Sequence, residues 1–205
     1  MKKRSARIQR RTAETQVALS LAIDGSGKAN VATGIPFFDH MLTSLAKHSL
    51  CDLTVKAMGD LDVDAHHTVE DIGIALGQAF REALGDKRGI RRYGWALVPM
   101  DESLAQARIA LDFSNRPFLV FQAKGWNRIS NVELGRGRSL RVGLVREFLQ
   151  GFANEARCNL HVDVLRGDEP HHIVEAIFKA LAKAIDQACQ RDPRVKGVPS
   201  SKGKL

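Results

Sequence analysis

The sequence predicts an α/β sandwich of the α+β kind, with a sheet on one side and helices on the other in each half of the chain. An internal repeat carries this prediction. The segments that start at Cys51 and at Cys158 both read as an alternating strand, a Gly-Asp turn and an HHxVE motif that opens an amphipathic helix. Such a duplication divides the 205 residues into half-repeats at 1–86 and 87–191, followed by a tail at 192–205.

The individual elements follow from hydrophobic periodicity. Alternating apolar and polar residues predict strands at 15–23, 53–57, 107–113 and 160–165. Apolar residues at helical spacing after Glu70 predict a helix that Gly85 ends. In the second copy, Pro170 suits the first helical position and Glu169 its cap. Each half should hold one more helix, because the stretches at 40–42 and 147–149 occupy equivalent places in the repeat.

The composition is that of a folded protein with an anionic partner. Apolar residues make up 44% of the chain, no run reaches the ~20 apolar residues of a membrane span, and the basic N-terminus leads into no apolar segment. The three cysteines form no CxxC pair, which indicates a reducing compartment, and we expect the cytoplasm. The net charge of +8 favours either nucleic acid or a phosphorylated metabolite as the partner.

Two HHxxE motifs hold four of the seven histidines. Residues four apart share one face of a helix, so His66 should lie beside Glu70, and His171 beside Glu175. Adjacent histidines diverge by about 100° around the helix axis and therefore suit different ions. Two motifs in register within a repeat indicate a metal site much more strongly than one such motif at an exposed helix start.

The repeat predicts two metal ions that draw ligands from both halves. One ion is predicted to bind His66, Glu70 and His172, and the other His67, His171 and Glu175. His40 and Glu147 hold equivalent places in the two halves and are expected to complete the two sets of ligands. Donors of this kind, without thiolate, suit manganese, iron, cobalt, nickel or zinc. Nearby carboxylates are expected to offset the helix dipoles that repel a cation, namely those of Asp64, Asp71, Asp168 and Glu169.

Other classes of protein fit parts of this pattern. A nucleic-acid-binding module would use the charge of +8, but it leaves the paired histidines unexplained, and 6% aromatic residues offer little base stacking. A two-metal hydrolase of phosphate esters needs a similar cluster and would release inorganic phosphate. A structural metal site would have closed coordination that does not respond to substrate analogues.

Taken together, the motifs resemble those of the imidazoleglycerol-phosphate dehydratase family. The resemblance rests on the stretches GIPFFDHML at 34–42, DAHHTVED at 64–71, LDFSNRP at 111–117 and PSSKG at 199–203. It runs from about Arg11 to the last residue and so covers nearly the whole chain. The paired HHxxE motifs, found together with these stretches, are highly specific for the family.

The resemblance implies a fold, an assembly and a cofactor. The fold is a duplicated βα half-domain similar to the second domain of ribosomal protein S5, with a four-stranded sheet and helices on one face in each half. The assembly is a 24-subunit shell of 432 symmetry, with active sites between subunits and two manganese ions in each. The implied metal ligands are His40, His66, His67, Glu70, His171, His172 and Glu175, with Glu147 where many relatives have histidine.

The implied reaction is a hydro-lyase step of histidine biosynthesis, in which imidazole glycerol phosphate loses water and becomes imidazole-acetol phosphate. Two ions would stabilise an imidazolate that expels the neighbouring hydroxyl, after which a base removes a proton from the next carbon. The resemblance nominates Glu14 as this base, with Glu70 and Glu175 assisting proton transfer. Substrate contacts are implied for Glu14, His40, His66, His67, Arg92, Arg116, Ser200, Ser201 and Lys202, the last five around the phosphate.

Three stretches of the chain stand apart. Asn115 lies where the family usually has glycine. Residues 124–141 are rich in arginine and glycine, match the family least well, and are expected to form a mobile loop. Residues 199–203 have the composition of a disordered tail, and we expect phosphate to order them across a subunit boundary.

Overall fold

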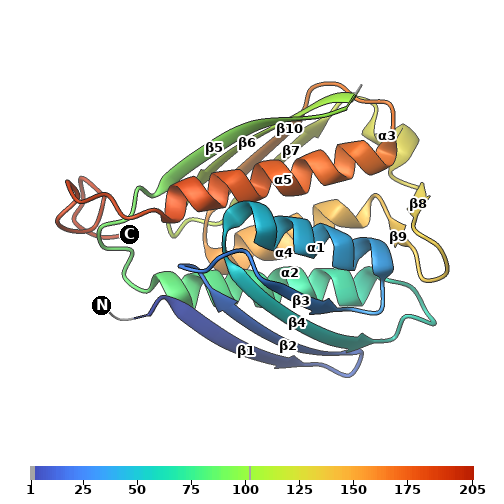
Figure 1. Cartoon of the computed structure of the whole chain (residues 1–205), viewed down its shortest axis with the longest axis horizontal. Coiled ribbons are helices and arrows are strands. Elements are labelled where there is room, and N and C mark those ends of the chain that lie inside the picture. The colour runs from blue at the N-terminus through green and yellow to red at the C-terminus, as the bar shows by residue number, and fades with distance from the viewer. Residues whose placement is uncertain (1–2, 102) are drawn as a thin grey trace.

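Two four-stranded sheets form the outer layers of the molecule, with the long helices between them (Figure 1). The computed structural model describes residues 3–101 and 103–205. The first sheet has the order β1 (Ser5–Arg11), β2 (Thr15–Ala22), β4 (Asp52–Gly59), β3 (Ala29–Ala32). The second has the order β5 (Tyr93–Met100), β6 (Ser103–Asp112), β10 (Asn159–Val164), β7 (Phe118–Ala123). In each sheet the last pair is parallel and the other pairs are antiparallel, so the topology repeats and the predicted fold class is confirmed.

The helices of one half pack against helices of the other. These helices are α1 (Pro36–Ser49), α2 (His66–Leu84), α4 (Leu144–Ala156) and α5 (Pro170–Cys189). α2 packs on β1 and β2, and α5 packs on β5 and β6. The opposite face of each of these helices also needs a cover. α1 of the first half supplies it for α5, and α4 of the second half supplies it for α2. The aromatic rings of Phe38, Phe148 and Phe178, all fully buried, meet where α1, α4 and α5 converge.

Glycines allow α2 and α4 to approach closely. A Cβ atom on Gly77 would lie 2.6 Å from the carbonyl oxygen of Phe152, and one on Gly73 would collide with the carbonyl of Phe148. Any larger side chain at either position would push the two helices apart. This contact fixes how the start of α2, with its HHxxE motif, sits against the first turns of α4.

The predicted strands and helix ends are confirmed. The four predicted strands correspond to β2, β4, β6 and β10. Gly85 follows α2 with a φ of 55°, a conformation that glycine adopts without strain, and its N–H donates to Arg81. Pro170 opens α5, and the carboxylate of Glu169 accepts a hydrogen bond of 3.2 Å from the backbone N–H of His171.

The expectation of a loop at residues 124–141 was wrong. This segment holds a short helix, α3 (Trp126–Ile129), and a small hairpin of β8 (Glu133–Leu134) with β9 (Leu140–Arg141). Trp126 packs edge-on against Phe121 of β7, and the N–H of Gly143 donates to the carbonyl of Ser130. Buried apolar side chains such as Leu134 and Leu140 stabilise the segment. Its high content of Arg and Gly led to the wrong prediction. Across the described residues, no helix has the length and apolar character needed to span a membrane.

Candidate metal and substrate site

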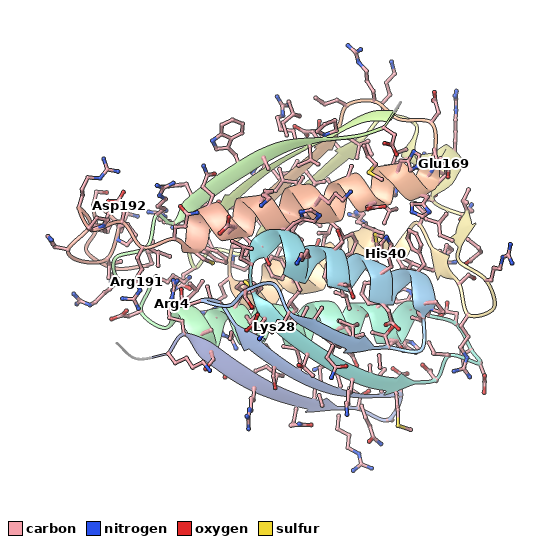
Figure 2. All side chains as sticks on the ribbon, in the orientation of Figure 1. Arg4, Lys28, His40, Glu169, Arg191 and Asp192 are labelled. Carbon is pink, nitrogen blue, oxygen red and sulfur yellow. The ribbon has the colours of Figure 1, made fainter. Side chains whose placement is uncertain are left out.

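The four long helices begin at one end of the molecule, and both HHxxE motifs therefore lie there (Figure 1). His40 and Glu169 mark this end in Figure 2, whereas Arg191 and Asp192 lie near the opposite end of the long axis. Helix starts leave backbone N–H groups without partners inside the helix. Asp64 accepts such a bond from the N–H of His66 at 2.7 Å, as Glu169 does for His171. Both motifs thus start beside a carboxylate that accepts a helix N–H, although the cap of α2 itself is Ala65 and that of α5 is Glu169.

His40, His171 and Glu175 form a compact group of possible metal ligands. One donor atom of each lies within 4.8 Å of the others, and this is the one such group of three found among the described residues. Glu175 Oε2 lies 3.3 Å from His171 Nε2 and 3.7 Å from His40 Nε2. His40 comes from α1 of the first half and the other two from α5, so the cross-packing of the halves creates this group.

Glu175 is the buried anchor of this group, with a side chain only 10% exposed. Lys179, one helical turn later, binds its other oxygen at 2.9 Å. Burial alone would raise the pKa of Glu175, but the hydrogen bond and charge of Lys179, with smaller contributions from His40 and His171, bring it below its ordinary value. The carboxylate is therefore held ionised and in one orientation.

The first motif is more open. His66 Nε2 lies 4.0 Å from Glu70 Oε2, and both side chains are about half-exposed. Glu147 belongs to the first turn of α4, one turn before Gly151, which lies against the backbone carbonyl of Glu70. Glu147 therefore stands beside the start of α2, as His40 stands beside the start of α5. The i, i+4 pairs that the spacing predicted are confirmed in both motifs.

His67 is turned toward two carboxylates of its own half. Its Nδ1 lies 2.9 Å from Asp60 Oδ2 and 3.6 Å from Glu14 Oε2. The hydrogen bond to Asp60, aided by the charge of Glu14, raises the pKa of His67 above its ordinary value. A carboxylate on one ring nitrogen leaves the other to bind a metal, the arrangement common around metal-ligating histidines.

Within one chain, the second histidine of each motif does not meet the ligands predicted for it. His67 lies with Asp60 and Glu14, and His172 Nε2 lies 3.9 Å from Asp101 Oδ2. The chain itself joins His40, not His67, to His171 and Glu175. The structure of one chain does not bring either predicted three-ligand set together, and both sets stay predictions.

The residues expected around the phosphate gather at the opposite end. The guanidinium of Arg92 binds both oxygens of Asp112 at 2.6 and 3.0 Å and donates to the carbonyl of Pro199 at 2.8 Å. The hydrogen bond to Asp112 raises the pKa of Arg92. Arg116 lies 3.8 Å from the same Asp112, but 64% of its side chain is exposed. Arg92 thus holds the tail against the body, and Arg116 presents its charge to solvent.

The tail folds back onto the body of the molecule. The N–H of Gly89 donates to the carbonyl of Gly197 at 3.0 Å, and Ser200 Oγ accepts from the N–H of Lys202 at 3.2 Å. Ser201 and Lys202 are exposed. The chain alone therefore supplies part of the order that we expected from phosphate, and the effect of phosphate on the tail stays a prediction.

A buried lysine explains the asparagine in the loop after β6. Asn115 has a φ of 60°, in the left-handed region that asparagine tolerates better than most residues. Its side-chain oxygen accepts a hydrogen bond of 2.8 Å from Lys87 Nζ, which also donates to the carbonyl of Phe113 at 3.2 Å. Burial lowers the pKa of Lys87 to about 8. The departure from glycine at this place thus adds a hydrogen bond that braces the loop of Arg116.

The two clusters of one chain lie far apart. The N–H of Arg92 donates to the carbonyl of Ala188 near the end of α5, whereas His171 is the second residue of that helix. At 1.5 Å per residue, this separation is about 25 Å. A ring and a phosphate joined by a three-carbon chain cannot span it. One substrate molecule therefore cannot reach both clusters of a single chain.

Sequence reasoning missed several residues of these clusters. Lys179 was visible in principle, because it follows Glu175 at the spacing of a helical ion pair. Asp60 was not, because it lies in a turn seven residues before His67, and no periodicity relates the two. Asp112 was read only as part of a motif, and its bridging of Arg92 and Arg116 depends on tertiary structure. Of the acidic residues expected to offset the helix dipoles, Asp71 instead contacts β1 and β2.

The fold and the two clusters define a class of duplicated α+β enzymes. Two of their helices start with histidine and carboxylate side chains, and a separate cluster contains arginine and lysine side chains. A sequence model of imidazoleglycerol-phosphate dehydratase matches residues 33–185. An imidazoleglycerol-phosphate dehydratase of Citrifermentans bemidjiense is 57% identical over 202 residues, which cover 98% of this chain and 99% of the relative. One of Halalkalibacterium halodurans is 54% identical, covering 98% of this chain and all of the relative.

Solved structures agree with this assignment. The crystal structure of the imidazoleglycerol-phosphate dehydratase from Staphylococcus aureus is similar with a TM-score of 0.77 and 36% identity, covering 92% of this chain and 99% of that one. The enzyme from Pyrococcus furiosus in complex with (S)-C348 gives a TM-score of 0.78 and 33% identity, covering 97% of this chain and all of that one. The chain belongs to the imidazoleglycerol-phosphate dehydratase family, which confirms the resemblance and the hydro-lyase class expected from it.

Proposed function

We propose that this protein removes water from imidazole glycerol phosphate to give imidazole-acetol phosphate in histidine biosynthesis, with two manganese ions in each active site. The group of His40, His171 and Glu175, in a member of this family, carries the proposal. The open first motif supplies the donors for the second ion. The ligands proposed are His40, His66, His67, Glu70, Glu147, His171, His172 and Glu175.

The donor set fits manganese. It contains imidazole and carboxylate groups and no thiolate, because the three cysteines are buried elsewhere. The structure also supplies the supporting contacts that such ligands need, with Lys179 on Glu175 and Asp60 on His67. When bound, the two ions would act as Lewis acids toward the nitrogens of the substrate ring and would hold the ring in place.

The chain's own residues would then handle the proton and the phosphate. Glu14 lies 3.6 Å from the ring of His67 at the start of α2. From there it would take the proton from the carbon next to the one that loses its hydroxyl. Glu70 and Glu175 would assist the proton transfer. Arg116, Ser200, Ser201 and Lys202, held in place by Arg92, would bind the phosphate through charge-assisted hydrogen bonds.

The distance between the two clusters supports active sites that combine parts of different chains. The metal end of one subunit would meet the phosphate end of another, and we propose that this happens in a 24-subunit shell of 432 symmetry. We propose the half-repeats 1–86 and 87–191 as the body of each subunit. The tail, residues 192–205, would then bind the phosphate in the active site of a neighbouring subunit. We also propose that the protein works in the cytoplasm.

Complementation between two inactive variants tests this arrangement. His171→Ala removes a proposed ligand at the metal end, and Lys202→Ala removes a lysine ammonium group at the phosphate end. If the sites are composite, a mixed assembly contains some sites without any defect and regains up to about a quarter of the wild-type activity. If both clusters of one chain served one site, mixing would restore nothing. Re-assembled wild-type protein is the reference.

The reaction itself is tested with protein stripped of metal by a chelator. Formation of imidazole-acetol phosphate should depend on added manganese and should occur without release of inorganic phosphate. Phosphate release without ketone would instead identify a two-metal phosphatase. Electron microscopy or light scattering should give the mass of 24 chains, and a smaller closed ring would overturn the proposed shell.

A further inference from the structure

Glu14 lies in an exposed turn that several hydrogen bonds hold in place. It is one of two residues between Thr12 and Thr15, where β1 turns into β2. Thr12 Oγ1 accepts hydrogen bonds from the backbone N–H groups of Glu14 at 3.2 Å and Thr15 at 2.9 Å. The N–H of Thr12 donates to the carbonyl of Thr15 at 2.9 Å. The backbone beside Glu14 is therefore fixed from both sides.

The hydroxyl of Thr15 connects this turn to α2. Thr15 is only 2% exposed, and its hydroxyl donates to Oδ2 of Asp71. It also lies 3.2 Å from Thr12 Oγ1, which can donate to it because Thr12 Oγ1 already accepts both N–H groups of the turn. A single direction of donation, from Thr12 to Thr15 to Asp71, satisfies every group in the chain of bonds.

Asp71 is the end point of this network. Its Oδ1 binds Nε and Nη2 of Arg10 on β1 at 2.9 and 2.8 Å. It directly follows Glu70 and lies one helical turn after His67, the ring beside Glu14. Asp71 therefore ties both strands of the hairpin to the helix that carries the first motif.

The internal repeat shows that the helix does not need this carboxylate in order to fold. The equivalent position in α5 is Ala176, which is fully buried. Burying a carboxylate has a free-energy cost unless hydrogen bonds and an opposite charge compensate it. Asp71 is only 8% exposed, and those compensating partners all come from the hairpin of Glu14.

A glycine brings the two parts close enough for this contact. Gly59 of β4 pairs with Thr15 of β2, and a Cβ atom on Gly59 would collide with Thr68 Oγ1 of α2. The start of α2 thus rests directly on the two strands, and the hydroxyl of Thr15 reaches the first turns of the helix.

We propose that Asp71 is a positioning residue, which acts through Thr15 to hold Glu14 beside the ring of His67. The inference rests on the proposed role of Glu14 as the base. Both oxygens of the Asp71 carboxylate contact the hairpin, and we assign it no contact with substrate or metal. Its function is to keep the hairpin in one position relative to the metal ligands of α2, so that the carboxylate of Glu14 meets the carbon that loses its proton.

Three substitutions in the assembled, manganese-loaded protein test the network. Thr15→Val keeps the shape of the side chain and removes the hydroxyl, and we expect kcat to fall about 10- to 100-fold with KM nearly unchanged. Thr15→Ser restores the hydroxyl and should recover most of the loss. Asp71→Ala, which copies the second half, should lower kcat to a similar extent. If Asp71→Ala does not fold, the two Thr15 variants carry the test.

A double-mutant cycle separates positioning from general stability. Glu14→Gln should lower kcat by about 100-fold or more, and adding Thr15→Val to it should cause no further fall, because no base is left to position. Additive losses would overturn the inference. Manganese content and the affinity for a substrate analogue should match wild type in Thr15→Val. Thr54→Val on β4, half-buried and opposite Ser20, is the matched control and should keep the wild-type kcat.

The outcomes distinguish this inference from the proposed function. If Glu14→Gln retained full kcat, Glu14 would not be the base, and that part of the proposed function would fail together with the inference. If Glu14→Gln were slow while Thr15→Val and Asp71→Ala kept the wild-type kcat, the proposed function would stand and only the positioning role would be overturned.

Discussion

The starts of α2 and α5 carry the same HHxVE pattern in the same register, yet their surroundings differ. In α5, Glu175 is 10% exposed and is bound by Lys179. In α2, the side chain of Glu70 is 46% exposed, and the residue four positions later is Ile74. The next residue differs as well, because Asp71 in the first copy contacts the hairpin of Glu14, whereas the second copy has alanine.

The two copies of the duplicated site have therefore taken on different roles. The spacing of the possible ligands stays the same in both copies, because it sets which groups share a helix face. The neighbours of the ligands have diverged. The second copy joins His40 into a preformed group of three, and the first copy is tied to the turn that carries Glu14.

The largest expected effect comes from removing one equivalent histidine from each copy. His171→Ala and His66→Ala should each lower turnover about 1000-fold or more, because each takes a ligand from one of the two ions. Their metal binding should differ. Since the group around His171 is preformed, His171→Ala should remove the tighter class of manganese sites and His66→Ala the weaker class.

Equilibrium dialysis of chelator-stripped protein, followed by metal analysis, measures these classes. His161→Ala on β10, an exposed histidine outside both motifs, serves as the control and should bind manganese as wild type does. Loss of the same class in both variants would show that the two copies are equivalent after all.

The second prediction exchanges the residues that follow the motifs. Ala176→Asp would place a carboxylate at a fully buried position of α5 and should lower the free energy of unfolding by about 3–5 kcal/mol. Asp71→Ala leaves the Thr15 hydroxyl without its acceptor, and we expect a loss of about 1–3 kcal/mol. Urea unfolding of metal-free protein gives both values. An unchanged unfolding free energy in Asp71→Ala would argue against a specific partnership of Asp71 with the hairpin.

The third prediction concerns Asp60, whose carboxylate lies 2.9 Å from His67, the second histidine of the first motif. Asp60→Asn should lower the raised pKa of His67 toward the ordinary 6.5 and weaken manganese binding about 10-fold. In metal-free protein the His67–Asp60 pair adds stability while His67 is protonated. That stability is complete below pH 6.5 and is lost as the pH rises through the raised pKa of His67.

NMR titration of the histidine ring signals in metal-free protein measures the pKa directly, and a calorimetric titration measures manganese affinity. Asp62→Asn, a neighbouring acidic residue whose side chain is 97% exposed, is the control. An unchanged His67 titration in Asp60→Asn would mean that Glu14, not Asp60, governs this ring.

The smallest effects are expected at the two carboxylates beside the helix starts. Asp64→Ala and Glu169→Ala each remove a carboxylate that accepts a bond from a helix N–H, and each should lower the unfolding free energy by about 1 kcal/mol. Thermal unfolding of metal-free protein is precise enough to compare them. Because the Asp64 bond is shorter, at 2.7 against 3.2 Å, its loss should be at least as large as that of Glu169.

Much of the fold was visible in the sequence because it is local. The alternation in β2 and β4, the cap at Glu169 and the stop at Gly85 are each decided by residues a few positions apart. The repeat then added long-range information, since it showed that both halves build the same unit. The loop predicted at residues 124–141 was wrong, because Trp126 and the short hairpin are stabilised by contacts that composition does not report.

The order of residues along the chain is enough to predict the duplication, the two helix starts and the types of group that they present. Three further features come from the packing of the whole chain: α1 lies on α5 and joins His40 to Glu175, Asp60 reaches His67 while Asp71 reaches the hairpin of Glu14, and Arg92 lies about 25 Å from His171. Periodicity reports which residues share a face of one element. Which faces of distant elements meet depends on how two hydrophobic layers cover each other, and that is a property of the whole chain.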